Sequence, residues 1–371
     1  MNSSSNDRAQ QGSRIELLMP SELRKNGWDQ LVGPDDVFLG TDWQAIVEQT
    51  ADSWLGYLIA SSDRPIAGLA MALASAEVPW PMGRPDVILS GALADSREDA
   101  NQAALRLGCP EGMNLSQRLL PSLTLGGRHL GHTRAVGSAL SLPLLDSLLI
   151  RAEAVADDLG ARSVSVPFLD ASDDILARAL EERGYVSFEV DEYSVLDVPD
   201  GGFDEYLTRL SGHRRREVLR ERRRNKEAGL KVGLRRLDQL DHTDLARLEI
   251  ALLAKYGTSW APANSLRWLE MIDSIAGSRA GAVVGTAEGK IRSFAVVYQH
   301  RDRWVVRQAG FDYEWQRAAR GALYFETIFY TMLEEAHESG VHRIHYGLSS
   351  GDAKRSRGCR SSQQRCWIAL R

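Results

Sequence analysis

Hydrophobic and polar positions alternate in two separate parts of the chain in a way that predicts β-hairpins. Between Trp54 and Leu73, two apolar runs flank the turn Ser-Ser-Asp-Arg-Pro. Between Gly281 and Gly310, three such runs are separated by the turns Ala-Glu-Gly-Lys and His-Arg-Asp-Arg. Short apolar runs bounded by turn residues are typical of antiparallel strands. We therefore expect a hairpin in the first half of the chain and three connected strands in the second.

Each half also contains one long segment with apolar residues at helical spacing. These segments run from Leu144 to Leu159 and from Ala322 to Ser339. Gly160 and Gly340 follow them directly, and a glycine after the last turn is a typical helix end. A β-rich stretch follows each glycine, so both halves are predicted to continue from helix to strand.

The repeated order of these elements predicts an internal duplication of one α/β unit. Arg183 and Arg357 each precede a glycine and a final extended run, which adds to the match. The alternative is that a hairpin, a helix and a strand simply form a common order. The sequence Pro-Asp-Gly-Gly marks the boundary between the two units. We therefore expect domains at 14–199 and 200–371, preceded by a disordered tail at 1–13.

Composition restricts the class of protein. The chain has 371 residues, more than one core usually holds, and no apolar run approaches the roughly 20 residues that span a bilayer. The first 13 residues lack the apolar region of a secretory signal. The three cysteines have no metal-ligand spacing, and the histidines are scattered, so we expect reduced thiols and no metal site. A cytoplasmic protein without membrane insertion is predicted.

Charge is distributed unevenly between the halves. Residues 1–199 carry 15 Lys and Arg against 29 Asp and Glu, whereas residues 200–371 carry 30 against 21. The basic second half is suited to a polyanion such as a phosphorylated cofactor, a nucleotide or RNA. Complementary charge between two packed domains is the alternative.

Three stretches of the second half resemble the FemAB-like branch of the GNAT acyltransferases. The first begins at Phe203 and leads into the Arg-rich run at His213; the others begin at Tyr324 and Tyr346. The resemblance implies an α/β fold with mixed sheets, built from tandem GNAT domains. It also implies either an acyl-CoA or an aminoacyl-tRNA as the acyl donor. Some FemAB enzymes carry a coiled-coil arm for tRNA, and the lack of such an insertion here favours acyl-CoA.

The resemblance implies that the donor's pyrophosphate lies at the start of the second long helix, where backbone N–H groups and the helix dipole favour an anion. The loop before that helix supplies four predicted donor-binding residues: Arg317, Arg320, Gly321 and Ala322. Arg320 replaces the middle glycine of the superfamily loop. An Arg-rich linker without a ligand is the alternative.

The corresponding stretch of the first half runs from Gly137 to Pro143. It has no basic residue, and proline has no N–H to donate. We therefore assign the donor and the chemistry to the second half. The first half is predicted to be a scaffold and one wall of the acceptor cleft.

An Arg-rich helix is predicted from Arg214 to Lys226. Arg216, Arg220 and Arg223 fall on one face, and guanidinium groups are typical where phosphate or carboxylate is held in a fixed geometry. Arg216 and Arg220 are therefore candidate contacts for tRNA, a nucleotide or an acidic acceptor. A solvated helix with internal ion pairs is the alternative.

Direct acyl transfer needs a base, an oxyanion donor and a proton for the leaving group. Glu326 is a candidate base or amine-orienting group, Tyr346 a candidate proton donor, and Asp352 a further candidate in a polar loop. In the same loop, Lys354 and Arg357 are candidates to hold an acceptor carboxylate or phosphate. The alternatives are an ordinary helix N-terminal acid for Glu326 and an ordinary strand residue for Tyr346.

Tyr256 and Trp260 are predicted either to line the acceptor pocket or, by their aromatic character, to pack in the core. The sequence has no nucleophile elbow and no cysteine in a reactive context, so no covalent enzyme intermediate is expected. We predict an N-acyltransferase that moves an acyl group from acyl-CoA, such as acetyl-CoA, to a small-molecule or peptide amine. The alternatives are an aminoacyl-tRNA-dependent transferase that forms an amide on a cell-wall precursor or small metabolite, and a non-catalytic module that binds nucleic acid or another ligand.

Overall fold

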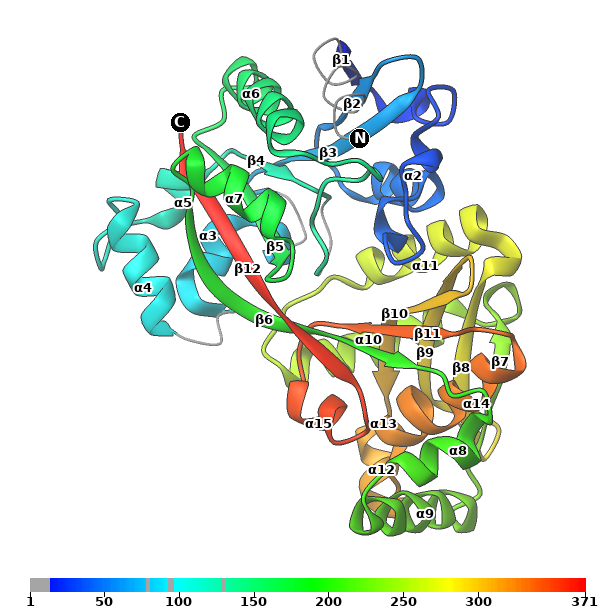
Figure 1. Ribbon diagram of the computed structural model, residues 1–371. Coiled ribbons are helices and arrows are strands. Elements are labelled where there is room, and N and C mark those ends of the chain that lie inside the picture. The colour runs from blue at the N-terminus through cyan, green and yellow to red at the C-terminus, as the bar shows by residue number, and fades with distance from the viewer. Residues whose placement is uncertain (1–13, 78–80, 93–96, 128–130) are drawn as a thin grey trace. The chain divides into compact units, whose positions relative to one another are not determined.

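The computed structural model describes residues 14–77, 81–92, 97–127 and 131–371, so the tail predicted at 1–13 lies outside the described residues. Hydrogen bonds join the described strands into a mixed sheet in the order β1-β2-β3-β4-β5-β12-β6-β11-β10-β9-β8-β7 (Figure 1). The predicted α/β fold with a mixed sheet is confirmed. Backbone contacts divide the chain into two compact units. Unit 1 extends to Tyr193 and includes Ser362–Arg371, and unit 2 is Ser194–Ser361.

The strands of unit 1 begin with an antiparallel group and end with a parallel pair. The group comprises β1 (Arg14–Leu18), β2 (Leu55–Ser61), β3 (Pro65–Ala74) and β4 (Ser122–Leu125). Strand β5 (Ser163–Asp170) is parallel to β4, and β12 (Arg360–Leu370) is antiparallel to β5. The hairpin predicted between Trp54 and Leu73 is thus confirmed as β2 and β3.

Helix α6 (Leu142–Asp158) is the predicted long helix of unit 1. It packs across β2 to β5 through buried residues that include Leu145 and Leu148, and Gly160 follows it in the left-handed region with φ of 65°. The other α-helices among the described residues of unit 1 are α2 (Thr41–Thr50), α3 (Pro85–Val87), α4 (Arg97–Arg106), α5 (Leu115–Leu119) and α7 (Asp174–Glu182).

The strands of unit 2 have the same order of pairing. Antiparallel strands β7 (Lys231–Arg236), β8 (Ala280–Ala287), β9 (Lys290–His300) and β10 (Arg303–Phe311) lead to β11 (Arg343–Gly347), which is parallel to β10. The last residues of β6 (Val186–Asp197) pair antiparallel with β11. The three strands predicted between Gly281 and Gly310 are confirmed.

The helices of unit 2 are α8 (Gly202–Arg209), α9 (Gly212–Glu227), α10 (His242–Lys255), α11 (Pro262–Ala276), α12 (Tyr313–Ala319), α13 (Leu323–Phe325), α14 (Thr331–Glu338) and α15 (Gly351–Arg355). Helices α13 and α14 are joined by a π-helical turn, η8 (Glu326–Tyr330). The single α-helix predicted over 322–339 is therefore interrupted. A π turn closes i to i+5 bonds over one extra residue, which a three-and-four hydrophobic spacing does not reveal. We call the stretch from Leu323 to Glu338 the central helix.

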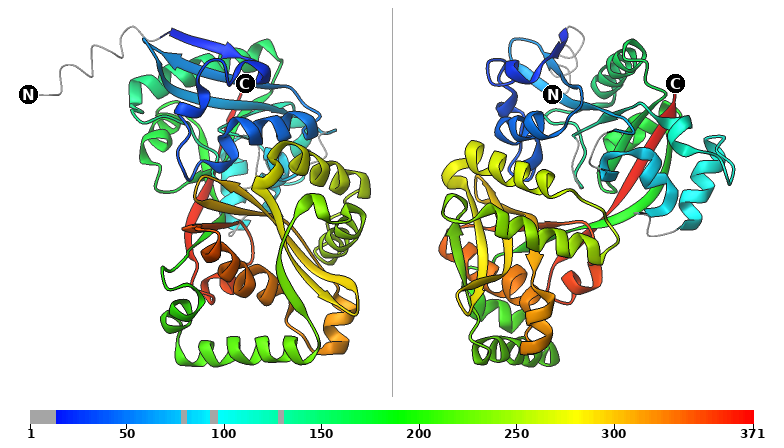
Figure 2. Two further views of the ribbon diagram at one scale, coloured as in Figure 1. Left: turned by 90° about the vertical axis from the view of Figure 1, so that its right-hand side faces the viewer. Right: turned by 180° about the vertical axis from the view of Figure 1, so that it is seen from behind.

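The sheet of unit 2 is covered on both faces (Figure 2). Trp304 and Phe311 of β10 pack with the central helix in a core that also holds Phe329, Met332 and Leu333. On the other face, α10 packs against β10 at Gly310. A Cβ atom added at Gly310 would lie 2.5 Å from the carbonyl carbon of Leu248. Side chains alternate between the two faces of a strand, which explains why neighbouring residues of β10 belong to different layers.

The two compact units do not coincide with the predicted domains. Their division after Tyr193 lies before the Pro-Asp-Gly-Gly boundary expected near residue 200. The end of β12, Ser362–Arg371, belongs to unit 1, although its sequence follows unit 2. A strand's sequence indicates that it pairs but not with which neighbour, so this grouping could not be read from the pattern. Within the described residues, no helix is both long enough and apolar enough to cross a membrane.

Candidate functional site

The carboxyl ends of β10 and β11 form the centre of the candidate site. These strands pair in parallel only from Arg303 to Val305 on β10. Beyond Val305, β10 continues to Phe311 beside β9, and within the described residues no ladder joins this part to β11, which ends at Gly347. The carboxyl ends of adjacent parallel strands are the usual ligand-binding edge of such sheets.

Aromatic side chains gather at this edge. Tyr313 follows β10, Tyr324 lies in α13, and Tyr256 caps the end of α10. The Nζ atom of Lys255 lies 4.2 Å from the ring centroid of Tyr313, and the side chain of Tyr324 hydrogen-bonds to that of Ser350 in the loop after β11. We call these five residues the tyrosine cluster.

Burial is the main cause that raises the pKa of Tyr313 and of Tyr324 to about 12, and the neighbouring Tyr256 adds to it. Both hydroxyls therefore keep their protons at neutral pH and can act as hydrogen-bond donors. Tyr256 is 68% exposed, so the prediction that it packs in the core is wrong. It stays a candidate contact for substrate.

The predicted donor loop lies beside this cluster. Arg317 and Arg320 are exposed, and Gly321 is half-buried. Arg320 has φ of 53°, a left-handed conformation that fits the position where the family loop has glycine. The backbone N–H of Ala322 donates to Oδ1 of Asn225 at 2.8 Å, so this amide already has an acceptor. The amides of Leu323 to Phe325 belong to the first turn, where helices lack internal acceptors.

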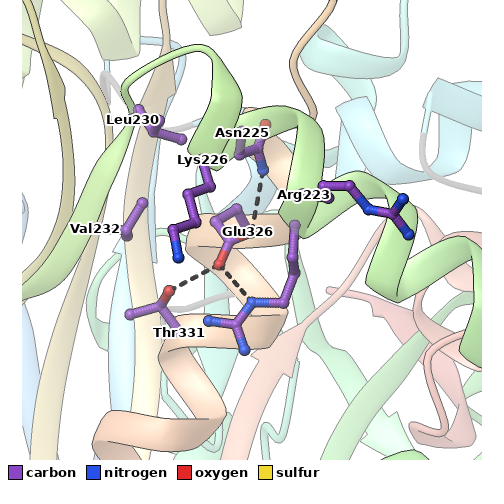
Figure 3. A pocket seen from close by; sticks show the side chains of 8 residues that line it. Arg223, Asn225, Lys226, Leu230, Val232, Glu326 and Thr331 are labelled. Carbon is purple, nitrogen blue, oxygen red and sulfur yellow. Dashed lines mark hydrogen bonds and ion pairs between the residues drawn. The ribbon is translucent and has the colours of Figure 1, made fainter.

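Glu326 lies away from the tyrosine cluster. Residues two positions apart on a helix do not face each other, so Glu326 and Tyr324 point to different sides. The Glu326 side chain is 5% exposed and accepts from Nε of Arg222 at 3.2 Å, Nδ2 of Asn225 at 3.0 Å and Oγ1 of Thr331 at 3.1 Å (Figure 3). It therefore anchors α9 to the central helix.

A cavity of about 400 Å³ opens beside Glu326. Helix α9 contributes Arg222, Arg223, Asn225 and Lys226, the central helix contributes Glu326 and Thr331, and Leu230 and Val232 complete the lining (Figure 3). We call it the α9 pocket.

Two residues predicted to hold an acceptor anion are buried in the protein. The Nζ atom of Lys354 donates to the carbonyl oxygens of Tyr346, Gly347 and Leu348 at 3.1, 2.8 and 2.7 Å. An ammonium has three donors, so these bonds occupy them all and fix the end of β11.

Arg357 is 1% exposed. Its Nη2 atom lies 3.1 Å from Oε2 of Glu221, its Nε donates to the Tyr330 hydroxyl at 2.9 Å, and its guanidinium lies 3.8 Å from the ring centroid of Phe325. The Tyr330 hydroxyl in turn donates to Glu221. This arrangement ties α9 and the central helix to the segment before β12.

Tyr346 and Asp352 differ in exposure. The Tyr346 hydroxyl is buried and donates to the carbonyl oxygen of Ile328 in the π turn at 2.8 Å, and burial raises the pKa of Tyr346 well above its ordinary value. Asp352 lies in the first turn of α15, shortly after Ser350; its side chain is fully exposed and pairs with Arg355 at 2.6 Å. Of the three predicted catalytic residues, only Asp352 has an exposed side chain.

The Arg-rich helix is confirmed as α9. Its inner face buries Val218, Glu221 and Asn225. Three of its cations bond within unit 2, namely Arg214, Arg215 and Arg222. Five remain exposed: Arg216, Arg220, Arg223, Arg224 and Lys226. Arg216 and Arg220 thus lie on the outer face of α9.

The equivalent edge of unit 1 is bridged by the chain itself. Past the end of β4, the N–H of Thr133 donates to the carbonyl oxygen of Phe168 on β5 at 2.9 Å, and the N–H of Phe168 donates to the Thr133 hydroxyl at 2.7 Å. On the other side, Val136 and Gly68 of β3 exchange two bonds of 2.8 Å. Among the described residues, Thr133 and Val136 therefore already pair with backbone groups of β5 and β3 at this edge.

The part of the chain that the structure describes contains no group of three His, Cys, Asp or Glu residues arranged to hold a metal ion. Cys109, Cys359 and Cys366 are buried free thiols, and burial raises the pKa of Cys359 to about 12, which keeps it unreactive.

Sequence reasoning missed Asn225, Arg222 and Glu221. They lie on the inner face of α9, whereas the Arg-rich run around them led to a prediction of ligand contacts on the outer face. The signal that was present is the spacing of Val218, Glu221 and Asn225, which marks one side of the helix as buried.

The chain resembles known proteins in sequence and in fold. Residues 126–370 match the FemAB-like family, described as peptidoglycan biosynthesis and recognition. No curated protein matches the chain in sequence. The structure of FemX has a TM-score of 0.62 at 11% identity, with 96% of this chain and 97% of that chain covered.

Two further structures share the fold over nearly the whole chain. A tandem GNAT protein from the clavulanic acid biosynthesis pathway has a TM-score of 0.55 at 12% identity, with 96% of this chain and 98% of that chain covered. The C-terminal domain of a putative lysylphosphatidylglycerol synthetase from Agrobacterium fabrum has a TM-score of 0.53 at 12% identity, with coverage of 94% and 92%.

Proposed function

The chain belongs to the FemAB-like family, and from this premise we propose that unit 2 is an N-acyltransferase that uses acyl-CoA and acylates an amine by direct attack. One observation carries the proposal. Beyond Val305, no backbone ladder joins β10 to β11 within the described residues. At the corresponding edge of unit 1, Thr133 and Val136 form bridging hydrogen bonds. An extended donor can pair with backbone groups only where the chain has not paired them itself.

The donor loop supports an anionic carrier. Arg317 and Arg320 are exposed at the start of the central helix, and guanidinium groups bind phosphate through charge-assisted hydrogen bonds. The first-turn amides of Leu323 to Phe325 add donors and the positive end of the helix dipole. The Ala322 amide is excluded from this role because Asn225 accepts its hydrogen bond.

The transfer itself requires that the amine attack the thioester carbonyl carbon, that the C–S bond break and that the thiolate take up a proton. The candidate donor to the oxyanion or to the departing sulfur is the Tyr324 hydroxyl, which is protonated at neutral pH. Asp352 is the candidate acceptor of the amine proton, since its side chain is exposed on the first turn of α15, which Ser350 precedes. Tyr256 is the candidate contact with the acceptor.

A second candidate function uses an aminoacyl-tRNA in place of acyl-CoA. The observation that favours it is the row of five exposed cations on α9, which is suited to a nucleic-acid backbone. FemX and this chain share the fold, and a polyanionic donor is compatible with the basic second half of the sequence.

A binding experiment with crossed variants separates the two donors. We expect CoA and acetyl-CoA to raise the melting temperature of the full chain, and Arg317→Ala/Arg320→Ala to weaken this binding at least tenfold, because two charge-assisted contacts are lost. The matched control Arg216→Ala/Arg220→Ala should leave CoA binding unchanged. Thiol release from acetyl-CoA with a panel of amines then tests turnover.

Stabilisation by charged tRNA alone, lost in Arg216→Ala/Arg220→Ala and retained in the loop variant, would favour the second candidate. No response to either donor, with salt-sensitive binding of any nucleic acid, would contradict both and favour a non-catalytic module.

A further inference from the structure

The α9 pocket has one negative and one positive wall. On the negative wall, Arg222 bonds to Glu326 and also to both oxygens of Glu334, at 2.7 and 2.9 Å. One guanidinium is thus shared by two carboxylates, which leaves this group with one excess negative charge.

Glu326 can accept one further hydrogen bond. A carboxylate has about four lone-pair sites, and Arg222, Asn225 and Thr331 use three of them. Oε2 accepts only from Asn225 among the described residues, so a ligand donor can complete it. The Thr331 hydroxyl, which donates to Glu326, keeps lone pairs for a second contact.

The positive wall consists of Lys226 on the last turn of α9, next to which Arg223 also borders the pocket. Neither side chain forms an ion pair within the described part of the chain, and in Figure 3 the side chain of Lys226 extends toward Thr331 and Glu326, whereas Arg223 points away. Lys226 is therefore the cation that faces a ligand in the pocket.

Apolar residues complete the lining. Leu230 lies in the turn before β7, and Val232 lies at the start of β7. Both border the space between the charged walls. A volume of about 400 Å³ lies within the range of small-molecule sites. The ligand that matches all three features carries an ammonium, a carboxylate and an apolar side chain.

We propose that the α9 pocket binds a free α-amino acid with an apolar side chain. Its ammonium bonds to Glu326 and Thr331, its carboxylate pairs with Lys226, and its side chain contacts Leu230 and Val232. The site is separate from the tyrosine cluster, because Glu326 and Tyr324 point to different sides of the central helix. The proposal therefore does not depend on which acyl donor the protein uses.

Calorimetric titration of the full chain at low ionic strength with each of the twenty amino acids tests the proposal. We expect at least one apolar amino acid, with L-leucine as the first probe, to bind. Leucinamide lacks the carboxylate and N-acetyl-L-leucine lacks the ammonium, so each should bind at least tenfold more weakly. Charge-assisted contacts of this kind are each worth about tenfold or more.

Variants locate the site. Lys226→Met should weaken amino-acid binding at least tenfold, whereas Lys290→Met, at an exposed lysine outside the pocket, should not change it. Glu326→Gln should also weaken binding, and if that variant does not fold, Lys226→Met carries the test alone. The proposal is overturned if none of the twenty binds, if N-acetyl-L-leucine binds as tightly as L-leucine, or if Lys226→Met retains full affinity.

Discussion

At the scale of the residue, Arg357 and Glu221 form a buried ion pair that Tyr330 completes. The charges are desolvated, and the Nη1 atom of Arg357 also donates to the Ser356 hydroxyl at 3.1 Å. Such a pair contributes little compared with apolar residues of the same shape, yet breaking it leaves an uncompensated charge in the core. The sequence indicated a cation in a polar loop, and nothing in the local pattern indicated that α9 would supply its partner.

We predict that Arg357→Met destabilises the protein by about 3–5 kcal/mol, because Glu221 loses its buried counter-charge. The double variant Arg357→Met/Glu221→Gln should recover about 1–3 kcal/mol, since the unpaired charge is gone. The free energy of unfolding in urea measures both effects. Arg355→Met is the matched control, because Arg355 is exposed with Asp352 and should change stability by less than about 1 kcal/mol. Equal effects of the two single variants would contradict the argument.

At the scale of the element, the central helix combines features that the sequence reveals with others that it does not. Its apolar spacing and the glycine at its end predict its extent, and both were found. The π turn and the Asn225 contact at its start were not predicted. Both depend on side chains from β11 and α9 that are distant in sequence, so a local pattern cannot show them.

The Tyr346 hydroxyl supports the π turn from β11, and we expect this to be its role. Tyr346→Phe should cost about 1–3 kcal/mol in unfolding free energy, because a buried hydrogen bond to the carbonyl oxygen of Ile328 is lost. The rate of thiol release should fall no more than a few fold. Tyr324→Phe is the matched variant in the tyrosine cluster, and it should lower kcat by about 100-fold or more with little loss of stability. If the two variants exchange these effects, the proton donor is Tyr346.

At the scale of the whole molecule, the order of secondary structure was predictable and the membership of the units was not. A hairpin, three connected strands, two long helices and the strands after them could be read from periodicity and turn residues. The last residues of β12 join unit 1 by pairing with β5, although the repeat pattern assigned them to the second half. Pairing partners are set by the packing of apolar faces over long sequence separations, and a strand carries no mark of its neighbour.

This grouping predicts that a core substitution near the C-terminus weakens the N-terminal half of the sequence. Trp367 is 5% exposed and packs with Leu145, Leu148 and Val164 in the core of unit 1. Trp367→Ala should cost about 3–5 kcal/mol, and hydrogen exchange should rise in α6 and β5 before it rises in the central helix.

Trp304→Ala is the counterpart in unit 2, where Trp304 is 3% exposed and packs with the central helix. It should cost a similar free energy, yet it should raise exchange first in β9, β10 and α14. The two variants therefore compare tryptophans of similar burial. The region in which each raises hydrogen exchange should depend on the core that the tryptophan packs in and not on its position in the sequence. If Trp367→Ala instead raised exchange in the central helix first, β12 would belong with unit 2, and the two units would follow the sequence repeat after all.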